Sequence, residues 1–244
     1  MPPMSSDAGR IYIAIAGNIG AGKSTLVDFL CRTYGVAPFF EPGVDGKSEE
    51  GGDNPYLADF YADMAAWGFH SQLYFLTHKF RIHQELDKTP GIVVQDRSIY
   101  EDAEVFAAAL YKSGKISERD WKTYGELYET ICNAIKPPDV MVYLKCSLKT
   151  TKQRIKLRGR AMEQSIPTSY LKLLQESYDA WFAKWTRSEV LVLDTDRLDY
   201  ISDLVDRLDV LDRIERFLPR RAIDPRAVRQ ARADGAAPVS AAGA

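Results

Sequence analysis

The stretch Ile11-Tyr-Ile-Ala-Ile-Ala-Gly17-Asn-Ile-Gly-Ala-Gly22-Lys23-Ser24-Thr25 decides the fold, because it contains the pattern GxxxxGK[ST] in a specific local context. The apolar run Ile11–Ala16 before the pattern predicts a buried strand, and the apolar spacing over Lys23–Tyr34 after it predicts a helix. A glycine-rich turn between a strand and a helix is the context in which this pattern forms a P-loop.

A P-loop at this place predicts binding of a nucleoside triphosphate. Its glycines allow backbone N–H groups to point at phosphate oxygens without a Cβ in the way, and the following helix adds its positive end. Lys23 supplies a charge for the β- and γ-phosphates, and the Ser24 hydroxyl is a candidate Mg²⁺ ligand. The residues expected around the phosphates are Gly17, Asn18, Ile19, Gly20, Ala21, Gly22, Lys23, Ser24 and Thr25.

Short apolar runs alternate along the chain with helical patterns, which predicts an α/β fold with a parallel sheet and right-handed crossovers. The runs are rich in Val, Ile and Leu, as expected of strands covered on both faces. The further strands are expected at Val36–Phe40, Ile92–Gln95, Val140–Leu144 and Val190–Leu193. The further helices are expected at Asn54–Leu86, with a break near Gly68, and at Ser117–Ile135, Leu148–Leu157, Pro167–Trp185 and Tyr200–Phe217.

Composition indicates one domain, over residues 11–218, with residues 1–10 and the Arg-, Ala- and Pro-rich residues 219–244 expected to be disordered. Gly43–Asp53 is expected to be an exposed loop. A net charge of −2 gives no reason to expect nucleic acid or an anionic membrane as a partner. The three cysteines are far apart, without the spacing of a zinc site or a disulfide framework, so the expected location is the cytoplasm.

Charged residues follow two of the expected strands, and in a parallel sheet this edge carries the working groups. Glu41 follows Val36–Phe40, while Asp96 and Arg97 follow Ile92–Gln95. Phosphoryl transfer to a hydroxyl needs a carboxylate to take its proton, a carboxylate for the metal and cations at the moving phosphoryl group. Alone, Glu41 fits a turn and Asp96 fits a helix N-cap; together, beside a P-loop, they predict an acceptor site.

A basic segment beyond the fourth expected strand contains Arg154, Arg158 and Arg160. Arg154 and Arg158 lie one helical turn apart, and Gly159 then frees the chain. Such a segment can close over a triphosphate as a lid and neutralise charge in the transition state, although a solvated helix end is the alternative.

Several segments resemble the deoxynucleoside kinase family, and most closely its bacterial deoxyguanosine and deoxyadenosine kinases. They cover residues 11–200 in the expected order. The matching segments are the P-loop, Glu41-Pro42, Asn54-Pro-Tyr-Leu with Tyr61, Trp67-Gly-Phe-His-Ser-Gln72, Asp96-Arg-Ser-Ile-Tyr-Glu-Asp102 and Leu157-Arg-Gly-Arg-Ala-Met-Glu163-Gln164. The resemblance implies a P-loop kinase fold, with ATP and Mg²⁺ used in nucleotide salvage.

The resemblance also implies how the transfer works. Glu41 would take the proton of the substrate 5′-hydroxyl, Arg97 would orient that hydroxyl, and Asp96 would lie near Mg²⁺ or act as the alternative base. The segment Arg154–Arg160 would be the lid. A homodimer is implied, built through helices at Glu101–Lys112 or in the Asn54–Leu86 stretch.

The remaining implied contacts concern the nucleoside. Tyr61 and Glu163 would hold the sugar 3′-hydroxyl, since a phenol can donate a hydrogen bond and a carboxylate can accept one. Gln72 would pair with the edge of the base, with Trp67 near that pocket and Phe106 as a stacking partner.

The resemblance implies that base choice depends on Lys79, which lies two helical turns after Gln72 on the same face, and on Asp102. A polar pair of this kind suits a purine or cytosine better than the methyl group of thymine. We therefore expect a preference for deoxyguanosine or deoxyadenosine, with deoxycytidine as the alternative. Lys in place of the more usual Arg weakens the inference, because Lys lacks the planar fork of Arg.

Two other functions fit parts of the pattern. A nucleoside monophosphate kinase of the thymidylate kinase type also has a P-loop, a Glu-Pro-Gly segment and a lid, but Phe39 and Phe40 stand where that family places an arginine for the acceptor phosphate. A regulatory module that binds triphosphate without transferring phosphate is the second alternative. The full set of Lys23, Ser24, Glu41, Asp96 and Arg97 speaks against it.

Overall fold

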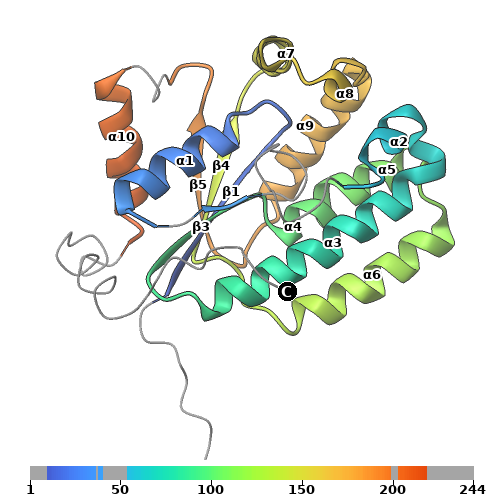
Figure 1. Cartoon of the computed structure of the whole chain (residues 1–244), viewed down its shortest axis with the longest axis horizontal. Coiled ribbons are helices and arrows are strands. Elements are labelled where there is room, and N and C mark those ends of the chain that lie inside the picture. Colours follow the sequence, from blue (N-terminus) through green and yellow to red (C-terminus); the bar gives the residue numbers. More distant parts are fainter. Residues whose placement is uncertain (1–9, 37, 41–53, 199–202, 219–244) are drawn as a thin grey trace, which may run out of the picture.

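A five-stranded parallel sheet forms the centre of the computed structural model, which describes residues 10–36, 38–40, 54–198 and 203–218. The strand order is β2-β3-β1-β4-β5, so β1 lies in the middle (Figure 1). The strands are β1 (Ile11–Gly17), β2 (Pro38–Phe39), β3 (Ile92–Asp96), β4 (Val140–Lys145) and β5 (Glu189–Asp194). The predicted five-stranded parallel sheet is confirmed, although β2 is shorter than Val36–Phe40.

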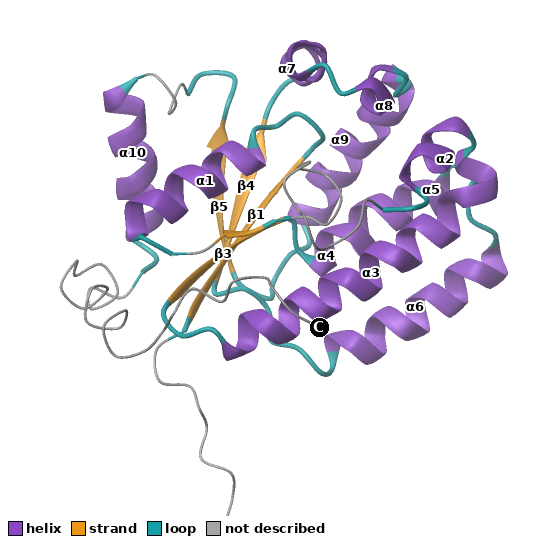
Figure 2. Ribbon diagram, viewed as in Figure 1, coloured by secondary structure: helices purple, strands orange, loops and turns teal. Residues whose placement is uncertain are grey.

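Helices cover both faces of the sheet, which explains the continuous apolar strands. In β1, Tyr12 and Ala14 pack into one core, while Ile13 and Ile15 pack into the other. Figure 2 shows α1 (Lys23–Tyr34) and α10 (Leu204–Glu215) on one side of the sheet, and α3 (Met64–Lys88), α6 (Glu118–Cys132) and α9 (Thr168–Phe182) on the opposite side. The larger of the two cores lies beneath the second group of helices.

The predicted helix Asn54–Leu86 consists of two helices, and its break lies at Asp63 rather than near Gly68. The first is α2 (Leu57–Ala62), and α3 begins at Met64. Asp63 has an extended backbone, and its Oδ1 accepts hydrogen bonds from the N–H groups of Ala65 and Ala66 at 3.0 and 3.1 Å. An N-cap carboxylate therefore starts the second helix, whereas Gly68 is buried inside it.

A continuous helical run follows β3 and contains a π-helical stretch. It comprises α4 (Ile99–Glu101), η1 (Asp102–Ala107) and α5 (Ala108–Lys112). Ser98 caps its start, because the Ser98 hydroxyl accepts from the N–H group of Glu101. π-Helical turns are frequent at functional sites, and this one carries Asp102 and Phe106.

The shorter helices α7 (Leu148–Arg158) and α8 (Ala161–Gln164) lie beyond the carboxyl ends of the strands, near the P-loop (Figure 1). Gly159, in the left-handed conformation at φ 71°, ends α7 and separates the two helices.

Some predictions concern residues that the structure does not describe. They are the disorder of residues 1–9 and 219–244, the loop Gly43–Asp53 and the position of Glu41. Among the described residues, no helix is both long and apolar enough to cross a membrane.

Candidate active site

The P-loop leaves the end of β1 through a turn that only glycine can make. A Cβ on Gly17 would lie 2.8 Å from the carbonyl oxygen of Leu144 in the neighbouring strand. Gly22 has φ 98° at the start of α1. Both positions therefore require glycine, one for close approach and one for its backbone conformation.

The Lys23 side chain folds back over this loop. Its Nζ donates to the carbonyl oxygens of Gly17 at 2.8 Å and Asn18 at 3.1 Å. The Asn18 side chain fixes the loop in turn, because its Oδ1 accepts from the Ile19 N–H and its Nδ2 donates to the carbonyl of Leu171 in α9. The ammonium and the helix start thus lie together, as phosphate binding requires.

Ser24 and Asp96 lie together at the ends of α1 and β3. The Ser24 hydroxyl donates to Asp96 Oδ2 at 2.6 Å, while Asp96 Oδ1 is buried and no described residue bonds to it. Two hard oxygen ligands beside a phosphate cradle suit Mg²⁺, which keeps several waters and takes few protein ligands. No group of three or more His, Cys, Asp or Glu side chains suited to a metal occurs in the described part of the chain.

Arg97 follows Asp96 in a strained turn. Its φ of 60° is the one positive value for a non-glycine residue among the described residues. Buried Lys79 holds this turn, since its Nζ donates to the carbonyl oxygens of Asp96 at 2.9 Å and Arg97 at 2.6 Å. The Arg97 N–H donates to the carbonyl of Ile15 at 3.0 Å. These contacts offset the cost of the left-handed backbone.

This position of Lys79 differs from the one that the sequence suggested. Its ammonium was expected to act with Asp102 in base recognition, but it lies on two backbone carbonyls. The physical reason is that a fully buried ammonium needs acceptors, and the strained turn presents two. A role of Lys79 or Asp102 in base choice stays a prediction.

The Arg97 guanidinium lies between an aromatic ring and a carboxylate. Its central carbon is 4.3 Å from the centroid of the Phe106 ring, a cation–π geometry, and its Nε donates to Glu101 Oε1 at 3.1 Å. Phe106, which was expected to stack on the base, therefore has Arg97 over its ring in this structure.

Sequence reasoning missed a buried cluster behind these groups. Glu101 Oε1 also accepts from the Gly17 N–H at 3.3 Å, and the Tyr178 hydroxyl contacts both Glu101 Oε1 and the Gly17 carbonyl. Burial raises the pKa of the Glu101 carboxyl, while Arg97 and Lys23 nearby lower it. Glu101 lies in the Asp96–Asp102 segment already noted, but no sequence motif marked Tyr178.

Gln72 lies on α3 and is almost completely buried, yet its Oε1 has no hydrogen-bond partner in the described ranges. Trp67, one turn earlier, is half-buried with its ring 5.8 Å from that of Tyr56. Buried amides are normally satisfied, so the unpaired oxygen of Gln72 is available to a ligand.

Tyr61, at the end of α2, is half-buried and lies near Tyr170 of α9. Burial raises the pKa of Tyr170, Tyr61 raises it further and Arg97 lowers it. Tyr170 was not predicted, and its buried hydroxyl has no hydrogen-bond partner.

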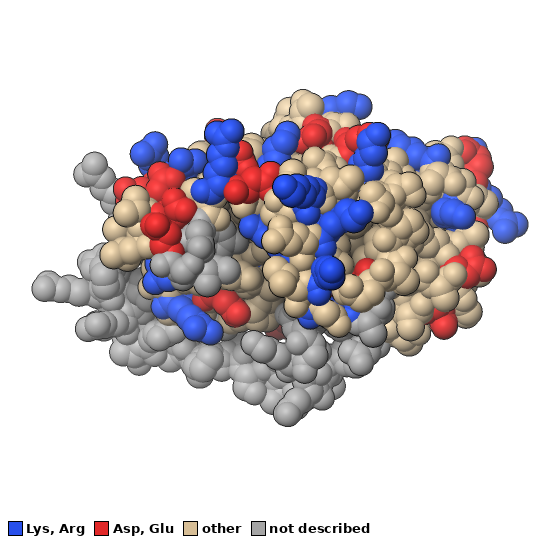
Figure 3. All heavy atoms as spheres, turned by 90° about the horizontal axis from the view of Figure 1, so that it is seen from above, with Lys and Arg blue, Asp and Glu red and all other residues tan. Residues whose placement is uncertain are grey.

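The predicted lid is held at both ends. Arg154 donates to the carbonyl of Ala21 in the P-loop at 3.0 Å and to the carbonyl of Thr195 at 2.8 Å. Arg158 Nε donates to Glu163 Oε2 at 3.0 Å, and Arg160 donates to Glu163 Oε1 at 3.4 Å. Glu163, expected to hold the sugar, thus pairs with two lid arginines here. Seen from above, Lys and Arg side chains gather over the middle of this face (Figure 3).

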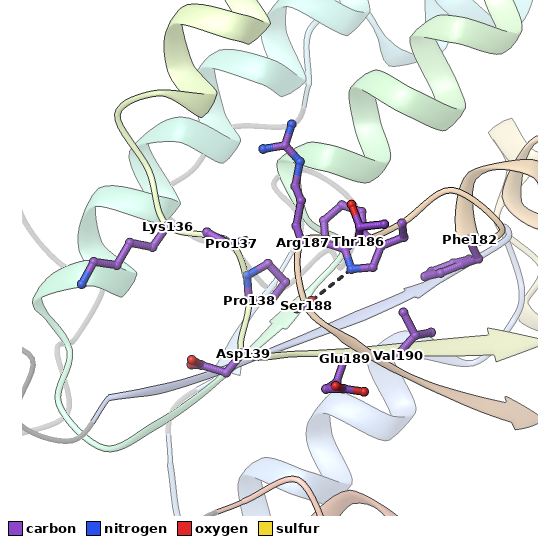
Figure 4. A pocket seen from close by; sticks show the side chains of 11 residues that line it. Lys136, Pro137, Pro138, Asp139, Phe182, Thr186, Arg187, Ser188, Glu189 and Val190 are labelled. Carbon is purple, nitrogen blue, oxygen red and sulfur yellow. Dashed lines mark hydrogen bonds between the residues drawn. The ribbon is translucent and has the colours of Figure 1, made fainter.

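A separate open cavity of about 860 Å³ lies at the opposite edge of the sheet, before β4 and β5 (Figure 4). Lys136, Asp139, Arg187 and Glu189 contribute its charges, and the Trp185 indole N–H donates to Ser188 at 3.0 Å on its wall. It is built at the amino ends of the strands, so it is not part of the phosphate site.

Together, the fold and this site define a P-loop phosphotransferase with a separate acceptor pocket. The model of the family described as "Deoxynucleoside kinase" matches residues 13–219, and the chain belongs to that family. The protein is therefore a deoxynucleoside kinase, which uses a nucleoside triphosphate as donor.

Relatives with different named substrates are similar to this chain. The deoxyadenosine/deoxycytidine kinase of Bacillus subtilis is 36% identical over 204 residues, which are 83% of this chain and 90% of that protein. The deoxyguanosine kinase of Lactobacillus acidophilus is 37% identical over 212 residues, which are 83% and 88% of the two chains. The structure of deoxyadenosine kinase from M. mycoides with bound dATP has a TM-score of 0.71 at 29% identity, covering 83% of this chain and 100% of that one.

These findings settle the class of reaction. The predicted family and its kinase activity are confirmed, so the monophosphate kinase and the non-catalytic module are set aside. The relatives divide between deoxyadenosine/deoxycytidine and deoxyguanosine kinases, and family membership does not choose among them.

Proposed function

We propose that this kinase transfers the γ-phosphate of ATP, with Mg²⁺, to the 5′-hydroxyl of a purine deoxynucleoside, deoxyguanosine or deoxyadenosine. The observation that supports recognition of a base is the buried Gln72, whose Oε1 has no hydrogen-bond partner within the described part of the chain. A Gln side chain offers one donor and one acceptor, a pair that fits N7 and the 6-amino group of adenine. For guanine, the amide has to rotate so that its N–H₂ group faces the acceptors.

The donor side of the proposal uses the cradle and the pair Ser24–Asp96. Lys23 neutralises charge on the β- and γ-phosphates, and Mg²⁺ bound by Ser24 and Asp96 supplies further charge stabilisation when present. The unpaired Asp96 Oδ1 supports this assignment, because a buried carboxylate oxygen without a donor suits a cation.

On the acceptor side, Glu41 takes the proton of the 5′-hydroxyl, while Arg97 orients that hydroxyl. Tyr61 and Glu163 hold the 3′-hydroxyl, and the lid arginines close over the triphosphate. Glu163 then exchanges an arginine for the sugar, which fits its position at the lid. Substituting Glu41→Gln should remove turnover while ATP still binds; full activity in this variant would assign the base role to Asp96.

A second candidate substrate is deoxycytidine, because the B. subtilis relative is named for deoxyadenosine and deoxycytidine. The cytosine edge also presents an amino donor beside an acceptor, so Gln72 could pair with it. The structures of the M. mycoides kinase, which is named for deoxyadenosine, contain dATP in one case and dCTP in another, so both candidate substrates are compatible with that relative.

The test is kcat/KM for deoxyguanosine, deoxyadenosine, deoxycytidine and thymidine with ATP and Mg²⁺. We expect a purine deoxynucleoside to rank first and thymidine last, because the buried carboxylate of Asp102 suits an amino group of the base better than the methyl group of thymine. Thymidine as the best substrate would contradict the proposal, and deoxycytidine as the best would replace it with the second candidate.

The proposal includes a homodimer in the cytoplasm. The expected interface uses helices of the Asn54–Leu86 stretch or of Glu101–Lys112. Sedimentation should give twice the chain mass of 27.5 kDa; a single-chain mass at micromolar concentration would contradict it.

A further inference from the structure

The Glu101 carboxyl touches both halves of the active site from a completely buried position. Its Oε1 accepts from the Gly17 N–H, at the start of the P-loop, and from Arg97 Nε, at the acceptor side. These two donors belong to different strand ends, β1 and β3. One oxygen atom therefore joins the donor cradle to the arginine of the acceptor site.

Tyr178 closes this connection from α9. Its hydroxyl lies 2.8 Å from the carbonyl oxygen of Gly17 and within hydrogen-bond distance of Glu101 Oε1. With one proton, it can donate fully to one of the two acceptors at a time. Glu101 and Tyr178 thus bind both backbone polar groups of Gly17: Glu101 accepts from its N–H, and the Tyr178 hydroxyl contacts its C=O.

The buried Glu101 carboxyl lowers the stability of the fold, which is unexpected for a residue with a purely structural role. Glu101 Oε2 is buried and has no hydrogen-bond partner among the described residues. A buried carboxyl with a free oxygen destabilises a fold compared with an apolar side chain of similar size. Such a group is expected where geometry at a site matters more than stability.

We propose that Glu101 is a positioning residue that fixes the Arg97 guanidinium relative to the P-loop. It acts through Arg97 and Gly17 and does not contact substrate. Phe106 supports the same position from the other side of the guanidinium, at 4.3 Å. The inference rests on the proposed role of Arg97 at the acceptor hydroxyl.

The experiment compares Glu101→Gln, Glu101→Ala and Arg97→Gln with the double variant Glu101→Ala/Arg97→Gln in steady-state kinetics. A misplaced catalytic group of about 1 Å can cost roughly 100-fold, so we expect Glu101→Ala to lower kcat by about this factor. Glu101→Gln keeps an oxygen acceptor and should lose only about tenfold, while the KM for ATP stays within about twofold. In the double variant, Glu101→Ala should lower kcat almost no further than Arg97→Gln alone does, because two groups that act as a unit have non-additive effects.

Glu104→Gln is the matched control, since Glu104 lies one turn further along the same helical run and is exposed. It should leave kcat unchanged. If the Glu101 variants fold poorly, Tyr178→Phe replaces them, because it removes one hydroxyl and keeps the ring. That variant should lower kcat several-fold in the parent chain and have no effect with Arg97→Gln.

The experiment distinguishes a failure of the proposed role of Arg97 from a failure of the proposed role of Glu101. Full activity of Arg97→Gln would remove the proposed role of Arg97 itself. A large loss in Arg97→Gln, combined with a kcat within twofold of the parent in both Glu101→Ala and Tyr178→Phe, would overturn only the role of Glu101. Independent, multiplying effects in the double variant would also overturn it, because Glu101 would then act without Arg97.

Discussion

The donor cradle and the acceptor pocket are built in different ways. Nine consecutive residues, 17–25, form the cradle, and the strand and helix that hold it are its immediate neighbours in sequence. The proposed acceptor pocket takes Tyr61 from α2, Gln72 from α3, Arg97 from the turn after β3 and Tyr170 from α9. One region is local in sequence and the other is assembled from segments more than 100 residues apart.

The two regions also differ in how their polar groups are satisfied. In the cradle, Lys23 already has two carbonyl partners from the loop itself. In the proposed pocket, Gln72 Oε1 and the Tyr170 hydroxyl are buried and have no hydrogen-bond partners among the residues that the structure describes. The Lys23 ammonium of the cradle therefore has hydrogen-bond partners without a ligand. The proposed pocket, in contrast, keeps unpaired groups that a nucleoside can satisfy.

The largest expected effect comes from the cradle. Lys23→Met removes the positive charge that faces the phosphates. It should lower kcat roughly 10²–10³-fold with every deoxynucleoside, as for other groups that stabilise developing charge. The ranking of the nucleosides should not change, since the pocket is separate. Steady-state kinetics with each of the four deoxynucleosides measures both the loss in kcat and the ranking.

Lys122→Met is the control, because Lys122 is exposed on α6 and pairs with Glu118 at 3.3 Å, away from the phosphate site. Its kinetics should match those of the parent. A changed ranking of nucleosides in Lys23→Met would show that the cradle and the pocket are not separable.

A smaller and more selective effect is expected in the pocket. Gln72→Leu removes a donor and an acceptor and should lower kcat/KM for the preferred purine nucleoside about 10–100-fold, the value of a good bidentate contact. The KM for ATP should stay the same. Unfolding in urea should show equal or higher stability, because the variant removes a buried oxygen that lacks a partner.

Gln84→Leu, on the exposed side of the same helix, is the matched control and should change neither quantity. Equal losses for all four nucleosides in Gln72→Leu would contradict a role in base recognition.

The smallest effect is expected where the two regions meet. Arg158 belongs to the lid and pairs with Glu163 of the pocket. Arg158→Gln should lower kcat/KM for both substrates about three- to tenfold, because two other lid arginines remain. Stability should change by less than about 1 kcal/mol, since the Arg158 side chain is 33% exposed and such pairs contribute little.

Arg119→Gln is the control for Arg158, as Arg119 is 89% exposed on α6. An effect of Arg158→Gln on the nucleoside alone would assign the lid to the acceptor pocket and sharpen the division between the two regions.

The sequence by itself determined the sheet and the cradle. Near-continuous apolar runs predicted a sheet covered on both faces, and the GxxxxGK[ST] pattern predicted the glycine-rich turn between β1 and α1. Both signals are local, because the hydrogen bonds of Lys23 and the turn at Gly17 form within one short segment. The end of α2 was missed, since an N-cap at Asp63 inside a helical pattern competes with the glycine at 68 as a break.

Only the tertiary structure decided how the remaining polar groups are used. Lys79 lies on the carbonyls of a strained turn, and the Glu101–Tyr178 pair joins Gly17 to Arg97. In sequence, Lys79 and Tyr178 stand in amphipathic helices with no motif around them. Their partners are fixed by the crossing of α3 and α9 with the strand ends, because a buried polar group bonds to whatever the packed fold brings within about 3 Å.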